Sequence, residues 1–291
     1  MNKTVLLVFC SIFSLASVSF ISAQRKTPAP VTFTKVSDRI YGVDGGSGAL
    51  SGVIIGDDCV VVIDAKMDEA SQKAVFAEIG RRTQKPVKYL VNTHGDGDHI
   101  YGNRFFPPGV TIISHDGCRK DFFLPGRGGG ASEWTKPELA PFIPSVTFTD
   151  RMNLYIGGVT VELHHFGIGH TIGDTVVYVP EEKAAFTGDQ VSLPMATYIH
   201  AYKGGNSFAH VRNLEKMLAA IDAERFITGH SGITDRAGVK SGIDAMKSFQ
   251  NRIRTLMGEK KSLDDIKKAF PAEDASVAEI VYKEIVEGRD R

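Results

Sequence analysis

The sequence predicts an α/β fold that carries a metal site where its strands end. Two observations support this prediction: short apolar runs alternate with stretches of helical periodicity, and clusters of His and Asp follow the apolar runs. The densest cluster is His94-Gly95-Asp96-Gly97-Asp98-His99, which comes directly after the apolar run 87–91. With 291 residues, of which 42% are hydrophobic and 23% charged, the chain can bury a large core.

The first half of the chain reads as strand, helix, strand, ligand cluster, helix and strand. Residues 53–63 are expected to form a hairpin that turns at 56–58, and its second arm is apolar on both faces, as in a central strand. A helix is expected over 68–82, where apolar residues recur at helical spacing. Buried strands are expected at 88–92 and 111–114.

The second half repeats this alternation. The expected strands lie within residues 146–166, 175–179, 184–186 and 225–227. Helices are expected over 206–221, capped by Asn206, and from about residue 239 onward.

Residues 121–144 have no clear periodicity and contain a glycine run and several prolines. A loop of this length is usually functional or disordered. Two interpretations stay open. The segment is either a lid in which Trp134 and Phe122 or Phe123 touch a substrate, or a solvated insertion.

The N-terminus reads as an export signal. Residues 1–23 combine Lys3 with an uncharged apolar stretch and a small-residue end, which predicts a cleaved signal peptide; an uncleaved membrane anchor is the alternative. Residues 24–33 are then a linker and 34–291 the folded domain with a helical C-terminus. The expected location is the periplasm or the exterior, with no stable membrane partner after cleavage.

The charge balance and the cysteine spacing argue against a nucleic-acid-binding protein and against a cysteine-based metal site. The 34 basic and 34 acidic residues give zero net charge, so the sequence offers no basic excess for nucleic acid. We therefore expect a small-molecule substrate, while the oligomeric state is left open. Cys59 and Cys118 do not have metal-binding spacing, and Cys59 is expected to be a buried apolar side chain.

The candidate metal ligands stand where strands end and close to glycines that allow sharp turns. They are His94, Asp96, Asp98, His99, His170, Asp189 and His230. Imidazole nitrogen and carboxylate oxygen are ligands that zinc accepts when thiolate is absent. The set is that of a two-metal hydrolytic site.

The order and flanks of these motifs resemble the metallo-β-lactamase-fold hydrolases. The matching pieces are Val62-Ile63-Asp64, the segment from Thr93 to His99, Gly169-His170-Thr171, Phe186-Thr187-Gly188-Asp189 and Thr228-Gly229-His230. The flanks look more like the glyoxalase II and general metallo-hydrolase side of the superfamily. The resemblance implies a four-layer αββα sandwich with the site along one edge of the two central sheets.

The resemblance also implies a role for each matched residue. His94 and His170 would hold the first metal, Asp98, His99 and His230 the second, and Asp189 would bridge them. Asp64 would brace the metal loops, and Thr93 and Thr171 would orient ligands.

Asp96 departs from the family pattern, which has His at this position. Three outcomes stay open: a first metal held by His94, Asp96 and His170 with reduced Lewis acidity, a harder metal such as manganese or iron, or a single metal at the second position. We favour one or two zinc ions, because a redox-inert ion suits an exported protein.

The chemistry expected from this site is hydrolysis by metal-bound hydroxide, with Asp98 as the catalytic residue that orients the nucleophile and passes a proton to the leaving group. The expected substrate is a small ester, lactone, thioester or amide, including a β-lactam, although Asp96 and Asp189 argue against a standard β-lactamase. The alternatives are a mononuclear-metal dehalogenase, an iron-dependent oxidoreductase, and a non-catalytic member that only binds a metal or ligand.

Overall fold

The computed structural model describes residues 28–125, 129–195 and 198–291. The predicted signal peptide, residues 1–23, and the first part of the predicted linker lie outside these ranges. The first strand begins at Thr32, slightly before the expected domain start at residue 34. None of the helices in the described ranges has the length and apolar character needed to cross a membrane.

The first sheet has seven strands in sequence order. They are β1 (Thr32–Lys35), β2 (Ile40–Asp44), β3 (Ser51–Ile55), β4 (Val60–Ile63), β5 (Val87–Asn92), β6 (Thr111–His115) and β7 (Val146–Phe148). Neighbours from β1 to β4 are antiparallel, and β4 to β7 run parallel. The predicted hairpin is β3–β4, and its second arm is buried along its whole length.

The second sheet has six strands, in the order β13-β12-β11-β10-β9-β8. They are β8 (Arg151–Tyr155), β9 (Thr160–His164), β10 (Val176–Val179), β11 (Ala184–Gly188), β12 (Arg225–Thr228) and β13 (Ile233–Asp235). Only β11 and β12 are parallel neighbours among these described strands. The sequence analysis did not predict β13, which is short and only partly buried.

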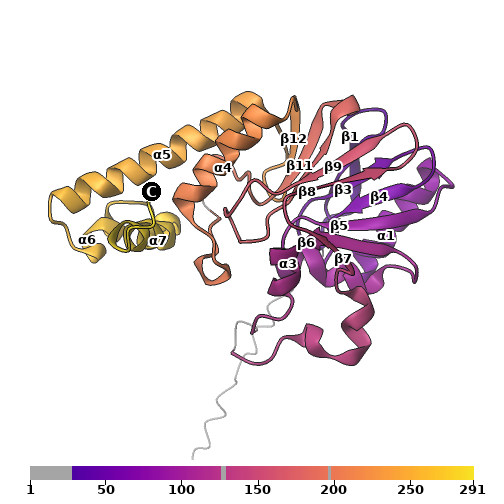
Figure 1. Ribbon diagram of the computed structural model, residues 1–291, viewed down its shortest axis with the longest axis horizontal. Helices are drawn as coiled ribbons and strands as arrows, with labels where there is room; N and C mark the ends of the chain where they lie inside the picture. The colour runs from indigo at the N-terminus through magenta and orange to yellow at the C-terminus, as the bar shows by residue number, and fades with distance from the viewer. Residues whose placement is uncertain (1–27, 126–128, 196–197) are drawn as a thin grey trace, which may run out of the picture.

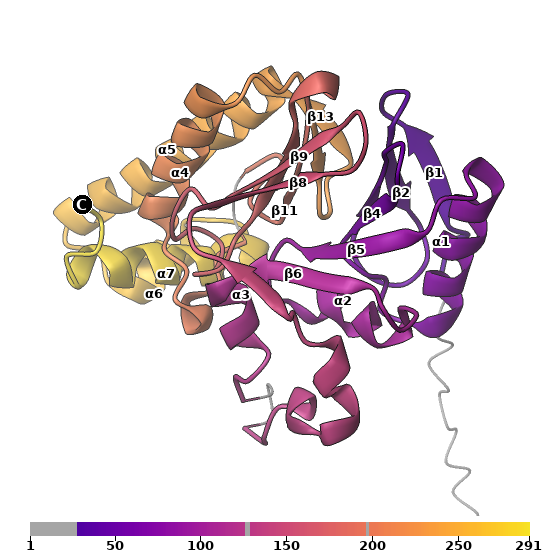
Figure 2. The ribbon, with the colours of Figure 1, turned by 45° about the vertical axis from the view of Figure 1, so that its right-hand side comes forward.

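Helices cover the outer faces of both sheets (Figure 1). They are α1 (Glu69–Arg82), α2 (Gly97–Ile100), α3 (Asp116–Asp121), α4 (Ser207–Ala220), α5 (Arg236–Gly258), α6 (Leu263–Lys268) and α7 (Ala275–Val286). Helix α1 lies outside the first sheet, and α4 and α5 lie outside the second (Figures 1 and 2). The predicted four-layer αββα sandwich is therefore confirmed.

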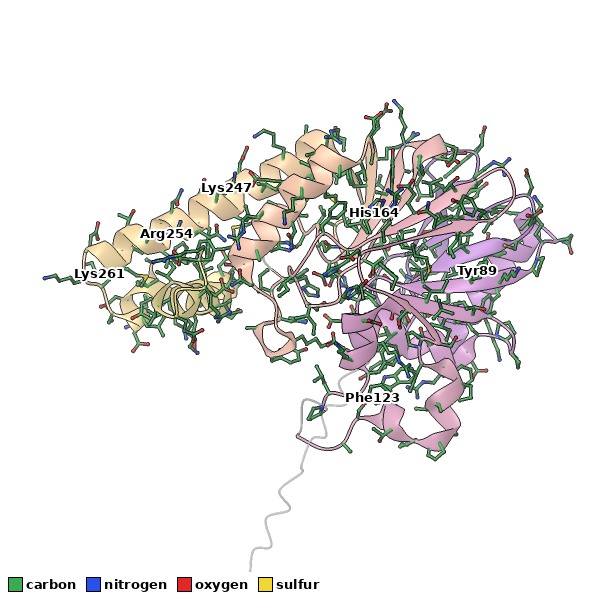
Figure 3. All side chains as sticks on the ribbon, in the orientation of Figure 1. Tyr89, Phe123, His164, Lys247, Arg254 and Lys261 are labelled. Carbon is green, nitrogen blue, oxygen red and sulfur yellow. The ribbon has the colours of Figure 1, made fainter. Side chains whose placement is uncertain are left out.

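Local sequence explains where the main helices begin. Asp68 caps α1 by accepting a hydrogen bond from the Ser71 amide at 2.8 Å, and Asn206 caps α4 by accepting from the Ala209 amide at 2.7 Å. Helix α5 begins at Arg236, three residues before the expected position near Val239. Charged side chains of α5 border α4: Lys247 pairs with Glu215, and Arg254 lies over the Phe208 ring (Figure 3).

Three apolar cores separate the layers. Ile63, Val91 and Leu163 belong to the core between the two sheets. A second core lies between the first sheet and α1, and a third between the second sheet and helices α4, α5 and α7. Burial at about 25 cal/mol per Å² of apolar surface makes these cores the main source of stability. The strand ends that carry the predicted ligands are thus held by packing on both faces.

The insertion 121–144 packs in a small apolar cluster with Ile100 and Cys118. Phe122 and Trp134 are 1% and 4% exposed and pack with Leu139 and Ile143. Two short 3₁₀ helices, η2 (Glu133–Thr135) and η3 (Pro137–Phe142), shape the segment. The described part of the insertion is therefore anchored by these four buried side chains, although many of its other residues are exposed to solvent. Phe123, by contrast, is 48% exposed on this insertion (Figure 3).

Both cysteines of the described ranges are buried. Cys59 and Cys118 are free thiols rather than a disulfide pair. The expectation that Cys59 is a buried apolar side chain agrees with its 3% exposure. Neither belongs to a group of metal-capable side chains in the part of the chain that the structure describes.

Candidate metal centre

The candidate ligands come from loops at one edge of both sheets. Strands β4 and β5 are parallel neighbours in the first sheet, and β11 and β12 are parallel neighbours in the second. Their C-terminal ends therefore point the same way within each pair. The cluster after β5, Asp189 after β11 and His230 after β12 meet between the sheets, and the loop after β9 adds His170.

Four buried side chains form the first group of donors. They are His94, Asp96, His170 and Asp189, and one donor atom from each lies within 4.8 Å of the others. Asp96 Oδ2 is 3.4 Å from His94 Nε2 and 3.2 Å from His170 Nε2. Asp189 Oδ2 is 3.8 Å from His94 Nε2.

Asp98, His99 and His230 form the second group. Asp98 Oδ2 is 3.1 Å from His230 Nε2 and 3.9 Å from His99 Nε2. Asp189 connects the two groups, because its Oδ1 is 3.2 Å from His99 Nε2 and its Oδ2 is 3.4 Å from His230 Nε2. The structure therefore brings all seven predicted ligands together, in the grouping that the family resemblance implied.

The donor atoms fit a divalent metal. His94 Nε2, His99 Nε2 and Asp189 Oδ1 are buried, and none has a hydrogen-bond partner among the described residues. Buried polar atoms rarely remain unpaired unless they serve an ion or ligand. Gly229 keeps this space open, since a Cβ there would lie 1.9 Å from Asp189 Oδ1. Nitrogen and carboxylate donors suit zinc and harder divalent ions.

Asp64 fixes the orientation of two ligands. Its Oδ1 accepts from the Thr93 amide at 2.8 Å, and its Oδ2 accepts from Thr93 Oγ1 at 2.7 Å and lies 2.8 Å from His99 Nδ1. Thr93 Oγ1 is also 3.0 Å from His94 Nδ1. The outward nitrogen of each ring is thereby held by the protein, and Nε2 is left to face the metal position.

Two further contacts orient His170 and its loop. His170 Nδ1 is 2.5 Å from the Tyr198 carbonyl oxygen. Asp174 accepts from the Thr171 amide at 3.0 Å and from Thr171 Oγ1 at 2.6 Å. Thr171 is thus tied to Asp174 in the turn that follows His170, and its expected role in orienting a metal ligand stays a prediction. The sequence analysis missed Asp174, because a carboxylate three residues after Thr171 is common in turns and carries no special spacing.

The ionisable side chains of the two donor groups shift one another's pKa values. Burial raises the pKa of Asp189, but the neighbouring His99 and His230 outweigh it and hold that pKa well below its usual range. Burial lowers the pKa of His170, yet its hydrogen bond to Asp96 and the nearby carboxylates raise it to about 9. Hydrogen bonds to Asp189 and Asp98 raise the pKa of His230 to about 9. Asp189 is therefore anionic, whereas His170 and His230 would have to give up a proton before they could coordinate a metal.

Asp96 has additional partners that the sequence did not predict. Lys203, from the 3₁₀ turn η5 (Ala201–Lys203), places Nζ 2.6 Å from Asp96 Oδ1. His200 Nδ1 lies 3.0 Å from Asp96 Oδ2, and Asp121 Oδ2 is 3.8 Å from the Lys203 ammonium. Burial raises the pKa of Asp121 to about 7, although Lys203 opposes this.

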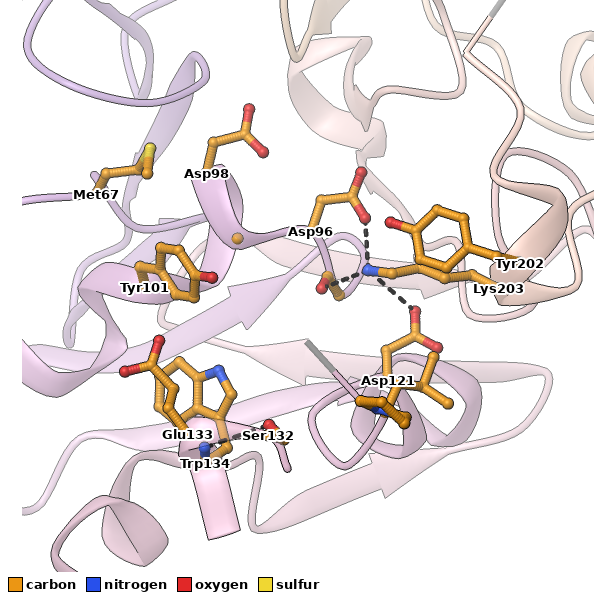
Figure 4. Close-up of a pocket in the computed structure, with 14 residues that line it drawn as sticks. Met67, Asp96, Asp98, Tyr101, Asp121, Ser132, Glu133, Trp134, Tyr202 and Lys203 are labelled. Carbon is orange, nitrogen blue, oxygen red and sulfur yellow. Dashed lines mark hydrogen bonds and ion pairs between the residues drawn. The ribbon is translucent and has the colours of Figure 1, made fainter. Parts of the chain in front are cut away.

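A pocket opens beside the donor groups, with a cavity volume of about 430 Å³ (Figure 4). Asp96 and Asp98 form one wall, and Trp134 of the insertion forms another with Tyr101. The two rings stack with centroids 6.4 Å apart. The insertion therefore contributes to the pocket wall, although its tryptophan is anchored in an apolar cluster and is not part of a free lid.

A buried imidazole behind the first group leads to a pH prediction. His210 of α4 is 1% exposed, and burial lowers its pKa to about 4. An unfolded His titrates near 6.5, so the unfolded chain binds more protons between pH 4 and 6.5. The free energy of unfolding should therefore rise with pH across this window, by up to about 3 kcal/mol from this group, and not change above it. Denaturant unfolding of His210→Gln should show a smaller rise than wild type; an equal rise would contradict this origin.

Comparisons with known proteins agree with this geometry. The family model described as Metallo-beta-lactamase superfamily matches residues 44–230. The chain is 21% identical over 240 residues to a metallo-beta-lactamase type 2 of Bacteroides fragilis, covering 78% of this chain and 89% of the relative. Its fold is similar to a metallo-beta-lactamase of Pontibacter korlensis at a TM-score of 0.62 and 19% identity, covering 75% and 99% of the two chains.

A further structural match is an enzyme with a different activity. The inverting sec-alkylsulfatase Pisa1 of Pseudomonas sp. gives a TM-score of 0.68 at 17% identity, covering 87% of this chain and 50% of that one. The chain thus spans half the length of the sulfatase. Because the family model matches well over half of the sequence, the chain belongs to the metallo-beta-lactamase superfamily of hydrolases.

Proposed function

We propose that the protein uses zinc to hydrolyse the acyl bond of a small ester, lactone, thioester or amide, including a β-lactam. The observation that supports this most directly is the pair of donor groups, joined by Asp189, beside a pocket that Asp96 and Asp98 line. A divalent metal held there would meet a substrate carbonyl in that pocket. His94, Asp96, His170 and Asp189 would hold one ion, and the residues Asp98, His99 and His230 would hold another with Asp189.

A metal held by these residues would supply a hydroxide nucleophile near neutral pH and would polarise the scissile carbonyl. Asp98 is placed to accept the proton of the nucleophile. Its Oδ2 faces His230, while the side chain keeps 32% of its surface exposed on the pocket side. Asp98 can therefore orient the nucleophile and pass its proton to the leaving group.

The pocket wall favours a substrate with an apolar part beside the reacting carbonyl. Tyr101 and Trp134 offer stacked rings, and Met67 adds a flexible apolar contact on the same wall. The Lys203 ammonium also borders the pocket, but it already contacts Asp96 and the Gly95 carbonyl oxygen. These contacts support a small neutral acyl substrate over one that needs a free ammonium partner.

Export and zinc are further parts of the proposal. The apolar stretch within residues 1–23 supports secretion or a periplasmic location. Zinc fits a set of imidazole and carboxylate donors and does not change redox state in an oxidising compartment. Manganese or iron are the other ions that the added carboxylate of Asp96 could favour.

A substrate panel with the zinc-loaded protein tests this function. We expect turnover of at least one p-nitrophenyl ester, lactone, acyl thioester or nitrocefin, and loss of that turnover after chelation. An alkyl sulfate and a haloalkane serve as comparison substrates, and oxygen consumption is followed with the iron-loaded protein. Bound metal without turnover of any acyl substrate would contradict the proposal and favour a binding role; oxygen consumption would favour an oxidoreductase.

A further inference from the structure

Lys203 reaches into the ligand cluster from a distant part of the chain. It lies 107 residues after Asp96 in sequence, and its side chain is 9% exposed. The ammonium donates to Asp96 Oδ1 at 2.6 Å and to the Gly95 carbonyl oxygen at 2.8 Å, and Asp121 Oδ2 lies 3.8 Å away (Figure 4). A Lys ammonium has three N–H donors, and two of them are used by Asp96 and Gly95, while Asp121 interacts with the ammonium as an ion pair.

The two oxygens of Asp96 therefore have different surroundings. Oδ1 receives the Lys203 hydrogen bond, whereas Oδ2 faces His94 Nε2 at 3.4 Å and His170 Nε2 at 3.2 Å. His200 Nδ1 lies at the edge of the carboxylate, 3.0 Å from Oδ2 and 3.2 Å from Oδ1. Lys203 thus limits rotation of the carboxylate and leaves Oδ2 directed at the first donor group.

Lys203 also changes the charge near that group. Asp96 and Asp189 bring two negative charges, and the imidazoles of His94 and His170 bring none when they act as neutral metal ligands. The ammonium offsets one of these charges at a distance where buried charges interact strongly. Removing either Asp96 or Lys203 alone therefore leaves the other with a buried charge that has lost its main partner.

We propose that Lys203 is the positioning residue for the first metal ligand set. It holds Asp96 by Oδ1 so that Oδ2 stays directed at the donor group that would hold the ion, and Asp96 and Lys203 work as one charge-balanced pair. The proposal rests on the proposed metal site, but it makes a claim about Zn²⁺ affinity that needs no substrate.

A double-mutant cycle tests the pair, with wild type, Asp96→His, Lys203→Met and the double variant. Zn²⁺ affinity is measured by competition with a chromophoric chelator, metal content by elemental mass spectrometry, and coordination by the absorption of the Co²⁺ form. Asp98→Ala should lower the Zn²⁺ affinity of the second donor group, so the binding step that it changes can be assigned to that group. Lys240→Met is the matched control, since Lys240 pairs with Asp244 on the exposed face of α5.

We expect wild type to bind two Zn²⁺. Asp96→His should weaken the first site about 10- to 100-fold although it supplies an imidazole, because the Lys203 ammonium would then face the cation without its carboxylate. Lys203→Met should weaken the first site when Asp96 is present, because it releases Oδ1. Added to the Asp96→His variant, the same substitution should strengthen the site by removing the repulsion. The sign of the Lys203 effect should therefore reverse between the two backgrounds.

Any other pattern would overturn the proposal. If Lys203→Met raised the Zn²⁺ affinity of the first site in both backgrounds, Lys203 would only repel the cation. If it lowered the affinity in both, Lys203 would support the fold in general, and melting curves would show the loss of stability. A single Zn²⁺ in wild type, unchanged in all variants, would show that Asp96 is not a ligand. Absence of Zn²⁺ binding would reject the metal site itself, whereas a sign reversal without any acyl turnover would reject only the hydrolytic function.

Discussion

Replacing Asp98 with Ala should lower kcat by about 10²- to 10⁴-fold, which is the range that a positioned proton-transfer group contributes. Asp98 combines two properties in one side chain: it contacts His230 at 3.1 Å in the second donor group, and it lines the pocket. The measurement is kcat with the best acyl substrate of the panel. A melting curve and the Zn²⁺ content check that the variant is folded and still binds metal. The variant should fold, because the Asp98 side chain is 32% exposed and belongs to none of the apolar cores.

Two further variants serve as controls for the Asp98→Ala result. Asp38→Ala removes an aspartate that is 92% exposed and forms an ion pair with Lys35, far from the donor groups, so it should leave kcat unchanged. Asp98→Asn keeps the size of the side chain but removes its ability to accept a proton. If Asp98→Ala kept more than about a tenth of the activity, its assigned role would be wrong.

Asp64→Asn should weaken Zn²⁺ binding about 10- to 100-fold without any direct contact between this residue and the ion. Asp64 accepts three hydrogen bonds, from the Thr93 amide, the Thr93 hydroxyl and His99. In the Asp64→Asn variant, the side-chain NH₂ group would face one of these three hydrogen-bond donors, and the negative charge of the carboxylate would be lost. His99 should then lose its fixed orientation. Chelator competition measures the affinity, and Asp58→Asn in the exposed hairpin turn is the control.

The backbone conformation of Asp64 allows the loss of ligand orientation to be distinguished from backbone strain. Its φ is +57°, a left-handed conformation that Asn tolerates and Ala tolerates poorly. Asp64→Ala should therefore lose about 1–2 kcal/mol more stability than Asp64→Asn, in denaturant unfolding of the two variants. Equal Zn²⁺ affinity of Asp64→Asn and wild type would show that the three hydrogen bonds do not orient the ligands.

The residues alone were sufficient to predict an α/β fold with candidate ligands at its strand ends, whereas the four-layer sandwich and the grouping of the ligands came from the family resemblance. Apolar runs on both sides of the hairpin and before His94 mark buried strands, and parallel strands bring their C-terminal ends to one edge. His170, Asp189 and His230 each follow such a run, so their place at strand ends could be expected from the residues, while their meeting with the cluster after β5 was implied by the family resemblance. Their binding of a metal stays a prediction.

The surroundings of Asp96 could not be predicted in the same way. The contact with Lys203 depends on how the 3₁₀ turn after Tyr198 folds back over the cluster, and no periodic pattern marks such a turn. The insertion 121–144 was ambiguous for a related reason: Phe122 and Trp134 are spaced without a helical or strand period, yet they share one apolar cluster. Both features arise from tertiary packing rather than from local preference.

Metal content and turnover, measured on one preparation before and after chelation, test the central claim most directly. We expect two Zn²⁺ per chain and hydrolysis of an acyl substrate. Chelation should remove both the metal and the activity, and stoichiometric Zn²⁺ should restore them. Hydrolysis that persists at full rate in the metal-free protein would contradict the account.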